Sequence, residues 1–284
     1  GGHLGFTKTF LKIKCRYYWP NMLKETENYV KSCIDCQTRK HPKQQPAGLL
    51  KPIPVGLPLE RVGVDVLGPF TKSDRGNVYI IVAMDYATKW AEAKAVPTAT
   101  AVETAQFLID QVVCKFGCPK EILSDRGQNF RSRLVSELLN GLGVRTCYTT
   151  AYHPACNGLV EHFNGTLAQM LSHYVSTNQK DWDLYVSLTC FSYNTARQET
   201  VKHSPFYLMF GREARLPVDI ALGQDHGGDQ EAEEVLRRVQ QCRRDVIKII
   251  AQSQRRQKER FDKTHRYVEY EVGDLVMVWT PTDR

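Results

Sequence analysis

The sequence has no long apolar run. The strand-like run from Tyr79 to Met84 is far shorter than the ~20 apolar residues that a membrane-spanning helix needs. The first residues also lack the apolar segment of a secretory signal peptide, so we expect no such leader. An apolar fraction of 42% over 284 residues is typical of a globular chain with a core of ordinary size. These absences argue against a membrane protein.

The cysteines do not form an even set. There are nine, and they include the Cys33-x-x-Cys36 pair. A disulfide framework requires paired cysteines, so this pattern favours reduced thiols and a metal site. No serine lies near a base motif, which argues against a covalent intermediate on the protein.

The net charge of +7 is unevenly distributed. Residues 1–51 carry ten Lys and Arg against three acids, and residues 235–266 carry eleven against three. Two basic flanks around a more acidic middle suit a protein that grips a phosphate backbone from both sides. The alternative for residues 235–266 is a solvated helix face with no partner.

Two carboxylates, Asp125 and Glu161, are separated by 35 residues. Asp125 follows the apolar pair 122–123 and precedes Arg126-Gly127, so it is predicted to end a strand. Glu161 is predicted to lie in the first turn of a helix that runs to about Tyr174, with Asn157 as its N-cap. The expected apolar positions are Leu159, Phe163, Leu167, Met170 and Tyr174, and the expected polar strip is Asn157, Glu161, Asn164 and Ala168.

A third acid, Asp65, lies within a predicted strand. Strand periodicity buries Val62, Val64 and Val66 on one face and turns Asp65 to the other. Three carboxylates that converge would need a counter-charge. Two divalent metals about 3.5–4 Å apart would supply it and would clamp the oxygens of a phosphoryl transfer. Carboxylates are ligands that Mg²⁺ prefers.

The N-terminal segment contains the ligand types of a tetrahedral zinc site. His3 precedes the Cys33–Cys36 turn, and residues 7–15 and 22–30 between them are predicted to be helical. Cys15 is expected to be buried by packing, and His41 is an alternative ligand. The competing interpretation is a reduced pair of structural cysteines.

Five ordered segments carry a family resemblance: VGVDVLGPF, ILSDRGQNF, AYHPACNGLVEHFN, SYNTARQ and SPFYLMFGREARLP. They resemble the integrases of gypsy-type LTR retrotransposons, which belong to the retroviral-integrase-like D,D-35-E family. The resemblance implies Asp65, Asp125 and Glu161 as catalytic residues that hold two Mg²⁺ or Mn²⁺ ions. It also implies Zn²⁺ on His3, Cys33 and Cys36 in a His-His-Cys-Cys domain. The family carries a further histidine a few residues before the position of His3.

The order of predicted elements indicates an α/β chain. Three strands (61–67, 78–84 and 90–96) precede a helix through Phe116 that Thr98 or Thr100 caps. A strand reaching Asp125, a helix over 132–140 and a strand over 144–149 follow. The resemblance implies that these form a ribonuclease-H-like core with a five-stranded mixed sheet. The predicted divisions are a zinc-binding domain (1–46), a linker (47–58), the catalytic core (59–222), a basic helical linker (223–266) and the start of an SH3-like barrel (267–284).

The helix expected over about 231–260 has a 3-4 apolar spacing at Leu236 or Val239, Cys242, Val246, Ile249 and Ser253. This stripe could be a dimer seam or an intramolecular packing surface. Asp85 competes with Asp65 for a metal role, but a turn that bonds its own backbone is favoured. Glu92 is expected to be structural. The candidates for DNA contact are His153, Asn157, Arg126, Arg131, Arg133 and His162.

The resemblance predicts a DNA integrase that trims the 3′ ends of element cDNA and joins them to target DNA. The expected partners are DNA, further copies of the chain and, by extension, chromatin, with no membrane, and the expected location is the nucleus. One alternative is a domesticated, non-catalytic DNA- or chromatin-binding protein descended from such an integrase. Another is a related metal nuclease that cuts DNA without joining it.

Overall fold

The computed structural model describes residues 3–39, 48–149, 158–222 and 232–274. The chain divides into two compact units, one made of Gly1–Lys51 with Gln257–Arg284 and the other of Pro52–Arg256. Across the described residues, none of the helices combines the length and apolar character that crossing a membrane requires.

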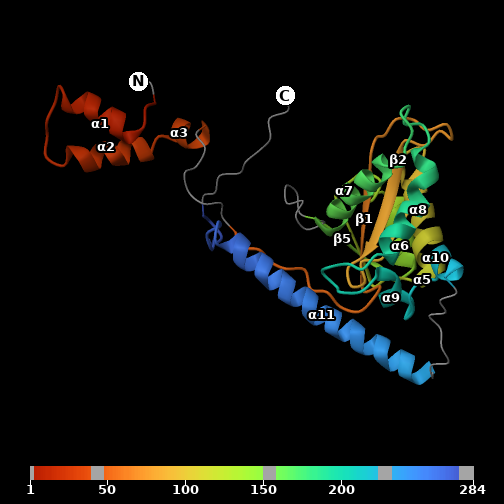
Figure 1. Cartoon of the computed structure of the whole chain (residues 1–284). Helices are drawn as coiled ribbons and strands as arrows, with labels where there is room; N and C mark the ends of the chain where they lie inside the picture. Colours follow the sequence, from red (N-terminus) through yellow and green to blue (C-terminus); the bar gives the residue numbers. More distant parts are fainter. Residues whose placement is uncertain (1–2, 40–47, 150–157, 223–231, 275–284) are drawn as a thin grey trace. The chain divides into compact units, whose positions relative to one another are not determined.

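A five-stranded mixed sheet forms the centre of the larger unit (Figure 1). The strands lie in the order β3-β2-β1-β4-β5. The first three strands pair antiparallel, whereas β1 pairs parallel with β4, and β4 parallel with β5. The strand bounds are β1 Arg61–Leu67, β2 Tyr79–Asp85, β3 Ala91–Val96, β4 Glu121–Ser124 and β5 Arg145–Tyr148. The five-stranded mixed sheet predicted from the sequence is confirmed.

Helices cover both faces of the sheet. On one face, the core joins Val62 and Val64 to α4 (Ala101–Phe107), the π-helical segment η1 (Leu108–Val113) and α6 (Arg133–Gly141). The short α5 (Cys114–Phe116) continues η1. On the other face, the core joins Ile80 and Val82 to α7 (Gly158–Ser172) and α8 (Trp182–Thr195). Of the two caps considered for the first of these helices, Thr100 is the one found, because its side chain accepts a hydrogen bond from the Glu103 N–H.

The buried stripe of α7 differs from the predicted one. The helix buries Val160, Phe163, Asn164, Leu167 and Leu171. Phe163 and Leu167 of the expected apolar row are buried, whereas Leu159 and Met170 are half-buried and Tyr174 lies beyond the helix end at Ser172. The buried row is rotated relative to the expected one, and Val160 and Leu171 complete it against the sheet. This rotation carries Asn164 inward with its apolar neighbours.

An ion-pair ladder joins the three parallel strands near their starts. Arg61, Glu121 and Arg145 are register partners on β1, β4 and β5. One Glu121 oxygen accepts a hydrogen bond from Arg61 Nε at 2.7 Å, and the other accepts one from Arg145 Nη2. Burial raises the pKa of Glu121, but the two arginine hydrogen bonds outweigh it and the pKa falls below its ordinary value. These ion pairs stabilise the register between β1 and β4, and that register places Asp125, which follows β4, next to β1.

The long helix α11 (Ala232–Asp262) packs on the core unit through an intramolecular stripe. Val246 and Ile250 join Val201 and Leu208 in one apolar cluster. This finding favours the packing interpretation of the 3-4 spacing over a dimer seam, with Ile250 as the buried residue rather than Ile249. Two short helices, α9 (Pro205–Phe210) and α10 (Pro217–Ala221), precede it.

The described N-terminal part of the smaller unit, residues 3–39, forms the helices α1 (Phe6–Lys14), α2 (Met22–Lys31) and α3 (Ile34–Arg39). In α1 and α2, Met22 and Thr26 are the buried residues. The expectation that Cys15 is buried was wrong: it follows the last residue of α1 and is exposed. The predicted barrel strand falls largely on residues 275–284, which lie outside the described part of the chain.

Candidate active site

Asp65 and Asp125 come from neighbouring parallel strands. Val64 on β1 is the register partner of Ser124 on β4, so the two aspartates follow a paired position. Val62 and Val64 lie in the core of one sheet face, and strand alternation places Asp65 on the opposite face, where α7 packs. The predicted orientation of Asp65 is therefore confirmed.

Asn164 on α7 reaches the Asp65 carboxylate. Its Nδ2 donates a hydrogen bond to Asp65 Oδ2 at 2.8 Å. Asn164 is 7% exposed, and its Oδ1 makes no hydrogen bond within the described residues. Glu161 lies one turn earlier on the same helix and is exposed. The helix that buries Asn164 therefore also brings Glu161 to the Asp65 side of the sheet.

The pKa of Asp65 is affected by two other acids, Asp125 and Glu161. Burial, together with the charges of Asp125 and Glu161, raises the pKa of Asp65 to about 6. Hydrogen bonds from the Val66 N–H and from Asn164 act in the opposite direction. Both neighbouring charges that act on this carboxyl are negative. A bound cation would offset this repulsion, and carboxylates are ligand types that suit a divalent metal. The ligand oxygens of Asp65, Asp125 and Glu161 do not all lie within 4.8 Å of one another in the described structure.

The turn after β4 fixes the Asp125 carboxylate. Asp125 Oδ1 accepts a hydrogen bond from the Gly127 N–H at 2.9 Å. A Cβ added at Gly127 would lie 2.9 Å from Asp125 Oδ1 and 2.7 Å from Asn129 Oδ1. Only glycine allows this close approach without a shift of the carboxylate.

We therefore expect Gly127→Ala to lower the metal-dependent DNA joining that the family resemblance implies by about tenfold to a hundredfold, because small misplacements of a reacting group have effects of that size. The steady-state rate of joining measures it. Gly141→Ala is the matched control, because a Cβ there meets nothing within 4 Å. Equal rates for Gly127→Ala and the parent would show that the turn does not position Asp125.

The sequence-predicted DNA contacts have mixed placements. Arg126 is exposed next to Asp125, and its Nε donates to the Thr149 carbonyl at 3.0 Å. Arg133 is paired with Glu137 along α6 at 2.6 Å. Arg131 and His162 are exposed. His153 and Asn157 lie outside the described residues. Arg126 and His162 are each adjacent in sequence to one of the acids, and all six residues remain predicted DNA contacts.

Asp85, the competitor for the metal role, and Glu92 both have structural partners, as expected. Asp85 is buried and accepts hydrogen bonds from the Leu59 N–H and from both the N–H and hydroxyl of Thr88. Burial raises its pKa. Glu92 accepts hydrogen bonds from Trp90 Nε1 and Lys115 Nζ, each at 2.9 Å. Neither carboxylate is directed to the Asp65 cluster by these contacts.

The N-terminal ligands form a compact set. His3 Nδ1 lies 3.4 Å from Cys33 Sγ and 3.4 Å from Cys36 Sγ. Tetrahedral zinc bonds of about 2.0–2.1 Å to nitrogen and 2.3 Å to sulfur place such atoms about 3.5–3.6 Å apart. Over the ranges that the structure describes, this is the one group of three His, Cys, Asp or Glu residues with ligand atoms within 4.8 Å of one another. The alternative ligand His41 lies outside those ranges.

Sequence reasoning missed two contributors to the acid cluster, Asn164 and Gly127. Asn164 was placed on a polar strip with Glu161, and its spacing of three residues was a usable signal. Its burial against Asp65 depends on the rotation of α7, which the apolar pattern did not reveal. The Gly127 requirement depends on the conformation of the turn around Asp125.

Two family models match the chain. Residues 1–42 match the model described as Integrase zinc binding domain, and residues 57–154 match the model described as Integrase core domain. The two matches follow one another in the order that the sequence predicted.

Curated relatives extend the likeness to nearly the whole chain. It is 29% identical over 282 residues to the Retrovirus-related Pol polyprotein from transposon 412 of Drosophila melanogaster, which covers 98% of this chain and 23% of the relative. It is 28% identical over 222 residues to Gypsy retrotransposon integrase-like protein 1 of Homo sapiens, covering 76% of this chain and 41% of the relative. The chain therefore spans less than half the length of these relatives.

A solved structure supports the fold. A chain from the simian T-cell lymphotropic virus intasome in complex with PP2A regulatory subunit B56 gamma aligns with a TM-score of 0.56 at 22% identity. The alignment covers 76% of this chain and 73% of that one. The chain therefore carries a match to an Integrase zinc binding domain followed by a match to an Integrase core domain, and the relatives that extend these matches along the chain are a transposon polyprotein and a gypsy integrase-like protein.

Proposed function

We propose that this chain is a metal-dependent polynucleotidyl transferase. It trims the 3′ ends of element DNA with water and joins the resulting 3′ hydroxyls to target DNA. The observation that carries the proposal is the half-buried Asp65, whose carboxyl is raised in pKa by burial and by the charges of Asp125 and Glu161. Three acids concentrated around one sheet position suit a cation site better than a structural role.

Asp65, Asp125 and Glu161 would hold two Mg²⁺ or Mn²⁺ ions. Such ions, when bound, supply a nucleophilic oxygen at neutral pH and stabilise the charge that develops on the transferred phosphate. The remaining work falls to the chain's own groups. Asn164 orients Asp65 through its 2.8 Å hydrogen bond, and the Gly127 N–H orients Asp125. Neither the trimming of the 3′ ends nor their joining to target DNA requires a nucleophilic side chain.

The N-terminal module is proposed to bind Zn²⁺ through His3, Cys33 and Cys36. The donor atoms and their 3.4 Å separations support this assignment. Its role would be structural, since the small helical module has few buried residues of its own.

The chain is also proposed to act as a homo-oligomer on DNA, in the nucleus. Leu184, Leu188 and Phe191 leave an exposed apolar strip on α8, at the helical spacing that a partner helix would cover. Basic flanks at residues 1–51 and 235–266 would hold the DNA backbone.

A non-catalytic DNA-binding protein derived from an integrase is the second candidate. The 28% identity to Gypsy retrotransposon integrase-like protein 1 favours it, because that relative is named as an integrase-like protein and not as a transposon polyprotein. The three acids favour the enzyme, because a protein kept for binding alone has no chemical need to concentrate them.

A strand-joining assay separates the two candidates. The chain would be incubated with branched and blunt oligonucleotides in Mg²⁺ or Mn²⁺, beside its Glu161→Gln variant. The matched control is Glu103→Gln, the same change in the first turn of α4. We expect joining by the parent and the control, and none by Glu161→Gln. DNA binding without joining in all three proteins would instead support the binding protein.

A further inference from the structure

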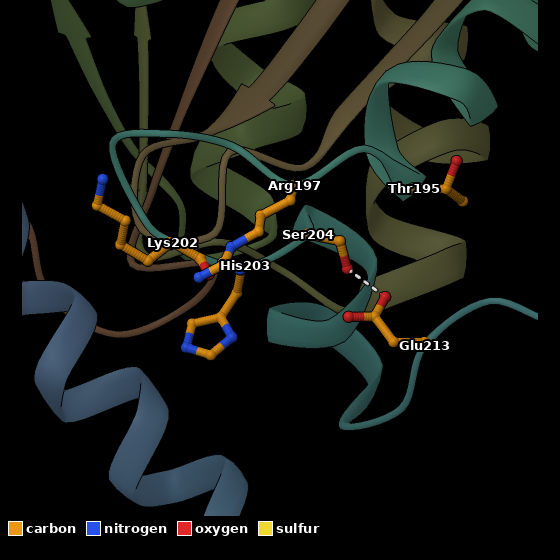
Figure 2. A pocket seen from close by; sticks show the side chains of 6 residues that line it. All are labelled: Thr195, Arg197, Lys202, His203, Ser204 and Glu213. Carbon is orange, nitrogen blue, oxygen red and sulfur yellow. Dashed lines mark hydrogen bonds between the residues drawn. The ribbon is translucent and has the colours of Figure 1, made fainter. Parts of the chain in front are cut away.

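A polar cavity of about 300 Å³ opens at the carboxyl end of α8. None of the residues that line it belongs to the acid cluster. Asn194, at the end of α8, hydrogen-bonds both the N–H and the carbonyl of Ala91, the first residue of β3. Ala91 on β3 is the register partner of Met84 on β2, and Met84 is the register partner of Gly63 in the first half of β1. The residues that line the cavity are Thr195, Arg197, Lys202, His203, Ser204 and Glu213 (Figure 2).

The loop that presents the basic residues is held in one conformation. This loop comprises residues 197–203, and a hydrogen bond closes it, because the Gln198 N–H donates to the His203 carbonyl at 3.0 Å. Arg197 Nε donates a second hydrogen bond across the loop, to the Lys202 carbonyl at 2.8 Å. Val201 is fully buried and packs in the cluster with Val246 and Ile250 of α11. Lys202 adopts a φ of 61°, which the surrounding contacts maintain. The loop is therefore organised before any ligand arrives.

The cavity has a basic side and, opposite it, a carboxylate that is hydrogen-bonded to a serine. Figure 2 shows Arg197, Lys202 and His203 together, and Ser204 joined to Glu213 opposite them. Ser204 Oγ donates to Glu213 Oε2 at 2.6 Å and accepts from the Tyr207 N–H. Arg197 and Lys202 are exposed. The terminal amino groups of Arg197 have no hydrogen bond within the described residues, so the guanidinium can still accept a ligand.

We infer that this cavity binds a phosphate group of a nucleic-acid backbone, as an anchor separate from the acid cluster. The guanidinium fork of Arg197 matches phosphate oxygens, and the Lys202 ammonium adds a second positive charge. The Ser204 hydrogen bond occupies one Glu213 oxygen, but the Glu213 charge still opposes an anion. The inference rests on the proposed function to the extent that DNA is the ligand.

The test is the salt dependence of duplex DNA binding by the full chain, followed by fluorescence anisotropy. Each lost phosphate contact lowers the slope of log affinity against log salt by about 1. The double variant Arg197→Gln with Lys202→Gln is expected to lower the slope by about 2 and to weaken binding about tenfold or more. Thermal melting of each variant checks that the fold is retained.

A charge-matched control, and a variant that removes the negative charge of the cavity, sharpen the result. Lys72→Gln with Arg75→Gln removes the same charge from exposed positions between β1 and β2 and is expected to change the slope much less. Glu213→Gln is expected to tighten binding about threefold or more, because it removes the opposing charge. Equal slopes for the two double variants, or weaker binding by Glu213→Gln, would overturn the phosphate assignment. The proposed function is tested separately, because this assay measures binding and the joining assay measures chemistry.

Discussion

Asp65→Asn is expected to abolish DNA joining and to make the folded protein more stable. Loss of a metal ligand removes several kcal/mol of transition-state stabilisation, which corresponds to about a thousandfold or more in rate. The stability gain has a separate cause. Burial and two like charges raise the pKa of Asp65 to about 6, so its ionised form is unfavourable in the folded, metal-free protein. An amide removes that charge.

The size of the gain follows from the pKa. A rise from 3.8 to about 6 corresponds to an upper bound of about 3 kcal/mol at neutral pH. Partial exposure of Asp65 reduces this to about 1–2 kcal/mol after solvent screening. The Asp65→Asn amide can also donate to the unpartnered Asn164 Oδ1 while accepting from Asn164 Nδ2. We expect the melting temperature to rise by a few degrees.

The pH dependence gives an independent check. A carboxyl whose pKa is raised on folding lowers stability fully above its folded pKa and not at all below its unfolded one. The parent should therefore gain stability, relative to Asp65→Asn, as the pH falls from about 7 to 4. Adding Mg²⁺ at neutral pH should raise the melting temperature of the parent and leave that of the variant unchanged.

Asp125→Asn is the matched control for the stability effect. Asp125 is exposed, and the new side chain can still accept the Gly127 N–H. Its stability should stay within about 0.5 kcal/mol of the parent, while joining is lost. A melting temperature for Asp65→Asn below that of the parent at neutral pH would contradict the account of Asp65.

Removing zinc should unfold the N-terminal module and spare the core. Residues 3–39 form three short helices, and in α1 and α2 Met22 is the buried apolar residue. Burial of one such side chain contributes about 1.5–3 kcal/mol, whereas structural zinc in small domains contributes about 10–16 kcal/mol. A zinc chelator is therefore expected to reduce helical circular dichroism and to expose residues 3–39 to trypsin. The unit from Pro52 to Arg256 should resist cleavage as before.

Cys36→Ser should reproduce the effect of the chelator, because it removes one of the three clustered ligands. Cys15→Ser is the control, since Cys15 is an exposed cysteine outside that cluster. Zinc content and tryptic patterns distinguish them. Normal zinc content in Cys36→Ser would show that the cluster does not hold the metal.

The elements that periodicity specifies were predictable from the sequence. The alternation of valines around Asp65 gave both the strand and the face to which its side chain turns. Thr100 and Ser132 precede the helices that their side chains cap. These features depend on neighbours in the chain, so local chemistry determines them.

The rest depends on contacts between distant segments. Two apolar rows compete on α7, and packing against β2 selects the one that includes Val160 and Leu171. That choice buries Asn164 beside Asp65, across 99 residues of sequence. The loop at residues 197–203 likewise owes its form to Val201 packing on α11. No short-range pattern specifies which of several surfaces a segment will meet.

The most direct test of the central claim counts the metal ions that the acid cluster binds. Mn²⁺ bound to the zinc-loaded chain, in complex with a branched DNA substrate, would be counted by electron paramagnetic resonance. The account predicts about two Mn²⁺ ions per chain, and a loss of this binding in Asp65→Asn while DNA binding persists. A parent protein that binds the DNA but no Mn²⁺, or an Asp65→Asn variant that binds Mn²⁺ as tightly as the parent, would contradict it.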